Sequence, residues 1–218
     1  MLQLENYPAF AKTKIICHGA RAYRIGERLI RQVWKYLQST EFVKGNISES
    51  ERKEMFDSIS LDGLLSYPDD IEKISTDCDI VYQIIFGDDV FEKLDLVTEK
   101  LNATPSITFV IDQKEGEIKN HAYINVEEKE LLDTFLDLFS VYTFPQEYAA
   151  DFEELRRLFE YKGEISTEKS KGFNFCIFRR TNRIRTFDNE IEGLEQEEGF
   201  FVLVSRIANE KTIKIYSI

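Results

Sequence analysis

The stretch DIVYQIIFGDD at residues 79–89 decides the fold of this chain. Its residues 80–86 are apolar apart from one glutamine, which is typical of a buried strand. The run ends in Gly87, Asp88 and Asp89, and helical spacing of apolar residues begins directly after them. A strand, a glycine and a helix start form the place where many α/β folds hold a phosphate. Two carboxylates after the glycine would repel a phosphate, so the sequence indicates a fold more clearly than a ligand.

The segments around this stretch repeat its pattern. Residues 14–17 are a short apolar strand candidate, and residues 25–37 place apolar side chains at helical spacing. A second amphipathic helix over 90–101 is followed by a nearly continuous apolar strand at 106–111. Two strand-helix-strand steps predict an α/β protein with a doubly wound, mainly parallel sheet. Residues 45–75 are polar and mixed, and we expect an excursion from the core there.

The second half of the chain changes in character. Residues 127–144 carry a wide apolar stripe, which predicts a central helix buried between two layers. A further helix is expected over 151–161, closing at Gly163 in a C-cap position. Three strands are expected after it, at 173–178, 199–204 and 212–216.

These elements predict two parts of unequal size. We expect a Rossmann-like α/β domain at residues 1–144, which includes the central helix, and a small α+β region at 145–218.

Composition excludes several classes of function. The chain has 218 residues and a formal net charge of -12, so its field opposes duplex nucleic acid and anionic membranes as the main partner. Three cysteines stand far apart, and an odd number argues against a disulfide framework. The N-terminus has no basic region followed by an apolar one, and no apolar run is long enough to span a bilayer. We therefore expect a cytoplasmic protein without a membrane segment.

Two pairs of carboxylates are candidates for chemistry. Asp88 and Asp89 could hold a metal ion at the end of a strand, or they could simply favour a helix start through its dipole. Asp151 and Glu154 lie three residues apart and so share one face of a helix. Their structural interpretation is an N-cap with a solvated acidic first turn.

Two arginine clusters are the best anion candidates on so acidic a chain. Arg21, Arg24, Arg28 and Arg31 punctuate the first helix, and the first two would lie near a crevice formed by Gly19 and Gly87. Guanidinium groups could hold a phosphate there, or could pair with surface carboxylates. A second cluster could bind the acidic surface of a partner or a nucleotide strand, and consists of Arg179, Arg180, Arg183 and Arg185.

The adjacent Cys17 and His18 invite interpretation as a nucleophile and its base. Neighbouring residues of a strand point to opposite faces, so we expect no hydrogen bond between them. His121 is expected in a loop or at an edge, without a visible partner.

Three segments, AADFEELR at 149–156, CDIVY at 78–82 and EGFFVLV at 198–204, are local matches to a known family. Together with the order of the elements, they resemble the tubulin and FtsZ superfamily. The resemblance implies that Asp151 and Glu154 would act on the nucleotide of the next subunit in a filament. The glycine-rich segment of the family is replaced here by GDDV at 87–90, and the first loop keeps only Gly19 and Gly26.

Three functions follow as expectations. The first is a non-catalytic protein of a divergent tubulin-like or FtsZ-like fold, which binds no cofactor and works through a protein partner or through self-association. The second is a protein that binds GTP with magnesium through Gly19, Arg21 and Gly87, with hydrolysis completed by Asp151 and Glu154 across a subunit contact. The third is nucleic-acid binding through the arginines of residues 179–185.

Overall fold

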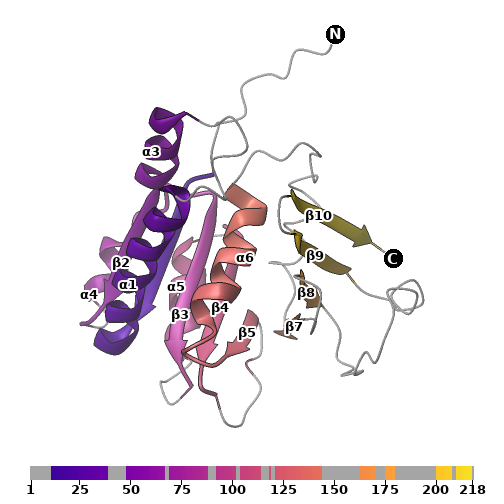
Figure 1. The fold of residues 1–218 in the computed structure, drawn as a ribbon. Helices are drawn as coiled ribbons and strands as arrows, with labels where there is room; N and C mark the ends of the chain where they lie inside the picture. Colours follow the sequence, from indigo (N-terminus) through magenta and orange to yellow (C-terminus); the bar gives the residue numbers. More distant parts are fainter. Residues whose placement is uncertain are drawn as a thin grey trace.

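The described part of the chain forms two sheets (Figure 1). The computed structural model describes residues 11–38, 48–66, 69–87, 92–101, 104–113, 118, 121–143, 163–169, 175–179, 200–207 and 210–217. The larger sheet has six strands, all parallel, in the order β2-β1-β3-β4-β5-β6. Its strands are β1 (Thr13–His18), β2 (Ile59–Leu64), β3 (Ile80–Phe86), β4 (Ser106–Ile111), β5 (Ala122–Val126) and β6 (Gly163–Glu164). The predicted α/β class is therefore confirmed.

Helices lie on both faces of the parallel sheet. One face is covered by α1 (Gly19–Gln38), α3 (Glu49–Asp57) and α6 (Leu131–Thr143). The other face is covered by α4 (Asp69–Lys73) and α5 (Glu92–Leu101). No helix in the described ranges is long and apolar enough to cross a membrane.

The central strands are buried on both faces, which explains their continuous apolar sequence. All residues of β1 and β3 are buried, and so are five of the six residues of β4. On the face of α6 the core is aromatic: the ring centroid of Phe135 lies 4.9 Å from that of Tyr82 and 5.9 Å from that of Phe109. Tilted and edge-to-face pairs of this kind stabilise a core beyond the area that they bury.

The prediction that residues 45–75 lie outside the core was wrong in one respect, because this segment contains a strand of the parallel sheet. Strand β2 pairs in parallel with β1 from Thr13↔Ile59 to His18↔Leu64. Its apolar pattern is interrupted by Asp62 and Gly63, and both residues are explained by packing. Oδ2 of Asp62 forms an ion pair with Nζ of the buried Lys14 of β1 at 2.8 Å. A Cβ at Gly63 would lie 2.5 Å from the ring of Tyr23.

Gly163, which was expected to cap a helix, begins a strand. Its N–H donates to the carbonyl of His121 at 2.9 Å, and Ile165 donates to Tyr123 at 2.7 Å. The parallel sheet therefore takes its sixth strand from beyond residue 144. The helix expected over 151–161 lies outside the described residues.

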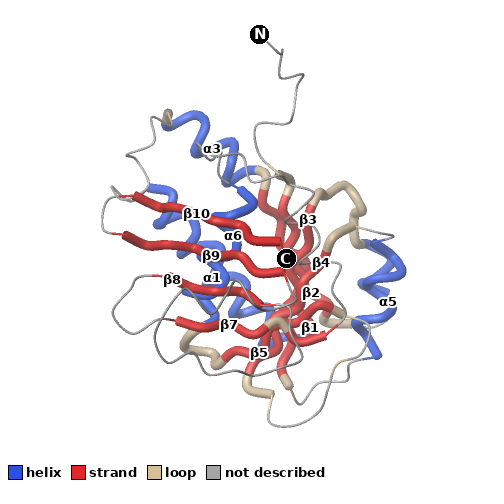
Figure 2. Tube along the Cα trace, turned by 90° about the vertical axis from the view of Figure 1, so that its right-hand side faces the viewer, coloured by secondary structure: helices blue, strands red, loops and turns tan. Residues whose placement is uncertain are grey.

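The smaller sheet is antiparallel, in the order β10-β9-β8-β7. Its strands are β7 (Ser166–Lys169), β8 (Phe175–Arg179), β9 (Phe200–Ile207) and β10 (Glu210–Ser217). It lies beyond β5 and α6, on the side of the molecule opposite α4, and Figure 2 shows its four strands side by side. The view in Figure 1 places α6 between the parallel strands and this second sheet.

We expect the substitution Gly26→Ala to destabilise the protein, although alanine is normally the better helix former. A Cβ at this position of α1 would lie 2.5 Å from Sγ of Cys17 and 2.8 Å from Cδ1 of Leu61. Overpacking of this kind costs about 1–3 kcal/mol in free energy of unfolding, which chemical denaturation will measure. The double variant Gly26→Ala/Cys17→Ala should recover part of the loss. A single variant more stable than the wild type would contradict this account.

Candidate functional site

The first candidate site is the carboxyl edge of the parallel sheet, where β1 and β3 end side by side. The register pairs Cys17 with Ile84, so Gly19 and Gly87 follow the ends of neighbouring strands. Helices leave to opposite faces from these two strands, which is where open α/β sheets usually bind ligands. The sequence thus placed these two glycines at one edge correctly.

The two glycines differ in what surrounds them. Gly19 has a φ of +85° and open space where a Cβ would lie. The space around Gly87 is filled. Its N–H donates to the carbonyl of Ile111 at 2.9 Å, and a Cβ at this residue would lie 2.5 Å from Cα of Gln113. A phosphate loop needs free backbone amides. The amide of Gly87 is already engaged in the sheet.

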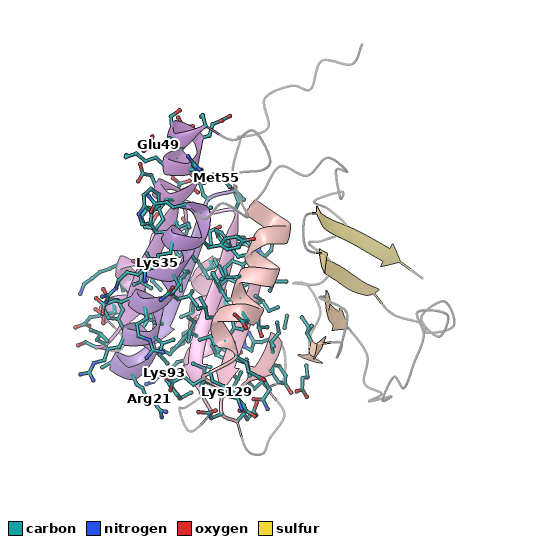
Figure 3. All side chains as sticks on the ribbon, in the orientation of Figure 1. Arg21, Lys35, Glu49, Met55, Lys93 and Lys129 are labelled. Carbon is teal, nitrogen blue, oxygen red and sulfur yellow. The ribbon has the colours of Figure 1, made fainter. Side chains whose placement is uncertain are left out.

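Arg21 lies at the same edge (Figure 3), and its guanidinium contacts two neighbouring side chains. Its guanidinium carbon lies 3.6 Å from the ring centroid of Phe86, and one nitrogen lies 3.6 Å from a carboxylate oxygen of Glu128. Glu128 also pairs with Arg28 at 3.5 Å. The same carboxylate therefore offsets two of the four arginines of α1 that the sequence offered as anion candidates. Arg24 is exposed on the outer side of α1.

Several predicted site residues lie outside the described residues, namely Asp88, Asp89, Asp151, Glu154, Arg180, Arg183 and Arg185. Arg179 is the last residue of strand β8. In the part of the chain that is described, no cluster of three or more histidine, cysteine and acidic side chains could hold a metal ion.

Cys17 and His18 point to opposite faces, as the strand geometry predicted. Cys17 packs under Gly26 of α1, and its burial raises the pKa of the thiol to about 12. His18 faces the other way, and its Nε2 lies 2.9 Å from Oε1 of Gln83 in β3. The pair therefore cannot work as a nucleophile and its base.

The bond between His18 and Gln83 is a polar contact inside the sheet. Both side chains are buried, and Nε2 of Gln83 has no hydrogen-bond partner among the described residues. Burial lowers the pKa of His18 to about 4, which keeps the ring neutral near pH 7, although the bond to Gln83 acts in the opposite direction. Neutral imidazole suits this site, because burial removes the water that would solvate a charged ring.

His121 has partners that the sequence did not reveal. It is buried at the start of β5, and its Nε2 lies 2.7 Å from Oδ1 of Asp95. Its Nδ1 lies 3.4 Å from Oγ1 of Thr98. Both partners come from α5, one helical turn apart. The contacts join α5 to β5 at the amino edge of the sheet, which is the edge opposite to the usual ligand crevice, so we interpret them as structural.

The second candidate site is the outer face of α1, and the sequence indicated only part of it. This helix has five exposed cations, at Arg21, Arg24, Arg28, Arg31 and Lys35, and one carboxylate, at Glu27. Near its carboxyl end a hollow of about 390 Å³ is lined by Arg28, Arg31, Gln32, Trp34, Lys35 and Phe56. The rings of Trp34 and Phe56 pack at 4.7 Å between centroids. Figure 3 shows Lys35 on this side of the helix.

Three of these cations lack a carboxylate partner in the described ranges, namely Arg24, Arg31 and Lys35. Their unpaired charge could not be read from the sequence, since any of the many acidic residues could have lain beside them. Phe56 comes from α3, and only the fold brings it to Trp34. Cationic and aromatic side chains together can bind acidic ligands that have an apolar part.

Comparison of the chain with protein-family models, with curated proteins and with solved structures finds no match.

We expect His18 to make the protein less stable as the pH falls from 6.5 to about 4. Over this window the unfolded chain takes up a proton that the folded chain excludes, so the free energy of unfolding decreases, by roughly 3 kcal/mol in all. Above pH 6.5 the ring is neutral in both the folded and the unfolded chain, so it does not change the free energy of unfolding with pH.

The variant His18→Asn cannot ionise, yet its side chain can still bond to Gln83. Urea unfolding at several pH values should show a smaller loss of stability in this variant than in the wild type. Acidic residues titrate in both proteins, so the difference between them isolates the histidine. A difference that stays constant with pH would contradict the prediction.

We expect GTP with magnesium to leave the melting temperature unchanged, because the amide of Gly87 is engaged and Arg21 is paired with Glu128. A site occupied at one hundred times its dissociation constant would stabilise the fold by about 2.7 kcal/mol. For a chain of this length such a gain raises the melting temperature by roughly 5–10 °C. An increase that is lost in Arg21→Ala would instead support the nucleotide alternative.

Proposed function

We propose that this chain is a non-catalytic protein-binding module, which associates with an acidic partner protein through the outer face of α1. The observation that supports the proposal is the unpaired positive charge of that face. Arg24, Arg31 and Lys35 are exposed and have no carboxylate partner in the described ranges. Beside them the hollow offers the aromatic side chains of Trp34 and Phe56.

The charge of α1 is opposite to that of the chain as a whole. Five cations and one carboxylate give the helix a formal charge of +4, so the rest of the chain contributes -16 to the net charge of -12. At physiological salt, charges interact over only about 8 Å. A partner in contact with α1 therefore experiences mainly its cations, while a long polyanion would also meet the acidic remainder. This asymmetry favours a compact acidic protein surface over DNA or RNA.

For the fold we propose a doubly wound sheet with α6 as its central helix and a smaller α+β region toward the C-terminus. Helices on both faces of the parallel sheet support the first part. Relationship to the tubulin and FtsZ superfamily is a further proposal, supported by the order of elements in the sequence. The engaged amide of Gly87 fits a member that has lost its nucleotide.

Two alternatives from the sequence stay predictions. GTP binding is favoured by the open space beside Gly19, and the melting experiment above tests it. Nucleic-acid binding through residues 179–185 depends on side chains outside the described residues. Charge reversal at Arg183 and Arg185 should then abolish salt-sensitive retention on RNA or DNA.

Reversing the charge of α1 should abolish binding to an acidic polypeptide. Polyglutamate serves as the probe, and isothermal titration at about 50 mM salt keeps screening weak. We expect the wild type to bind and Arg24→Glu/Arg31→Glu to lose the heat of binding. The control Lys73→Glu/Lys129→Glu changes the net charge equally at cations that already have carboxylate partners, and it should bind like the wild type. Equal binding by all three proteins would sink the proposal.

A further inference from the structure

The cations of α1 form one straight row along the helix. Arg21, Arg24, Arg28, Arg31 and Lys35 follow each other at intervals of three, four, three and four residues. With 3.6 residues per turn, this spacing keeps all five within an arc of about 80°. The row is about 21 Å long at 1.5 Å per residue. We call it the cationic stripe.

The stripe lies on the side of α1 turned away from the core. The buried residues of the helix, from Ala22 to Leu37, face the parallel sheet, whereas every member of the stripe is exposed. The hollow with Trp34 and Phe56 flanks the stripe at its carboxyl end. The surface thus has a linear array of charges and one apolar contact point beside it.

We propose that the element of the partner that binds here is an α-helix, with carboxylates at the same alternating spacing and one apolar side chain that enters the hollow. This inference rests on the proposed function and specifies its partner. Helices that pack at about 20° present side chains to each other at intervals of three and four residues. Carboxylates on such a helix can meet the successive cations of the stripe in register.

An extended acidic segment fits the stripe less well. Successive cations are separated by about 4.5 or 6 Å along the axis of α1. Side chains on one face of a strand repeat every two residues, or about 6.6–6.8 Å. Over the four intervals of the stripe the mismatch grows to roughly 6 Å, which is about one full interval. A strand can therefore pair with part of the stripe, and a helix with all of it.

The existing ion pairs of the stripe leave most of it available. Glu128 reaches Arg21 and Arg28 at 3.6 and 3.5 Å, yet both arginine side chains stay about two-thirds exposed. Arg24, Arg31 and Lys35 have no carboxylate partner in the described part of the chain. A docking helix would thus find two cations that share Glu128, namely Arg21 and Arg28, and three that have no carboxylate partner among the described residues.

Trp34 makes the inference directly testable, because it is the sole tryptophan of the chain and lies in the hollow. Its fluorescence reports docking without a label if the peptides contain no tryptophan or tyrosine. The test compares two peptides of about 18 residues and identical composition. As a helix, a peptide of this length is longer than the stripe. In one, glutamates alternate at three and four residues; in the other, they occupy every second position, which spreads them around a helix but aligns them on a strand.

We expect the first peptide to change the emission of Trp34 and to bind at least about tenfold more tightly than the second, because only the first can pair with the whole stripe. Its helix content, measured by circular dichroism, should rise on binding. Arg24→Gln/Arg31→Gln should weaken binding by about 2- to 5-fold for each lost pair. Lys73→Gln/Lys129→Gln is the matched control and should leave the affinity unchanged.

The outcomes separate the inference from the function on which it rests. Equal affinity for the two peptides, with a loss in the arginine variant, overturns the helical partner and supports the acidic partner protein. Equal binding by wild type and arginine variant overturns both. Single-stranded RNA that binds the wild type more tightly than the first peptide at the same salt, and loses this affinity in Arg24→Gln/Arg31→Gln, also overturns the helical partner, since the stripe would then recognise phosphates.

Discussion

The structure depends on the parallel pairing of β1 with β3 and on the burial of this pair on both faces. Every residue of the two strands is buried, so each face must be covered by helices. The close approach of α1 is possible because Gly26 lies directly over Cys17 and Leu61, where no larger residue has room. This contact fixes which side of α1 faces the sheet. The opposite side, with the cationic stripe, is thereby directed to the solvent.

The sequence predicted those parts of the fold in which local pattern and burial agree. The run at 80–86 and the strand at 106–111 are apolar because both faces are covered. Strand β2 escaped prediction because it lies at the edge, where Asp62 pairs with Lys14 and Gly63 makes room for Tyr23. Such contacts depend on the neighbouring strand and helix, which a local pattern does not contain.

The candidate sites were predictable to a different degree. The arginines of α1 are visible in the sequence, and their alternating spacing already places them on one side of a helix. The sequence does not show which of these arginines form ion pairs. Their partner Glu128 comes from the segment before α6 and, in the described part of the chain, pairs with Arg21 and Arg28 only. Likewise, Trp34 meets Phe56 only after α3 has packed against α1. Tertiary contacts therefore decide which cations of α1 are paired and place an apolar contact point beside them.

Two groups that a phosphate would need are already engaged at the carboxyl edge of the sheet, namely the amide of Gly87 and the guanidinium of Arg21. Gly87 is drawn against Gln113 by its bond to Ile111, which uses the amide that a phosphate would need. Glu128 lies at the same edge and binds the first arginine of α1, so the charge that could have replaced that amide is offset as well. Farther along the helix, beyond Arg28, no described carboxylate does the same. Among the described residues, the positive charge of α1 is thus offset by a carboxylate near the strand ends and not toward Trp34, which is where the proposed partner would bind.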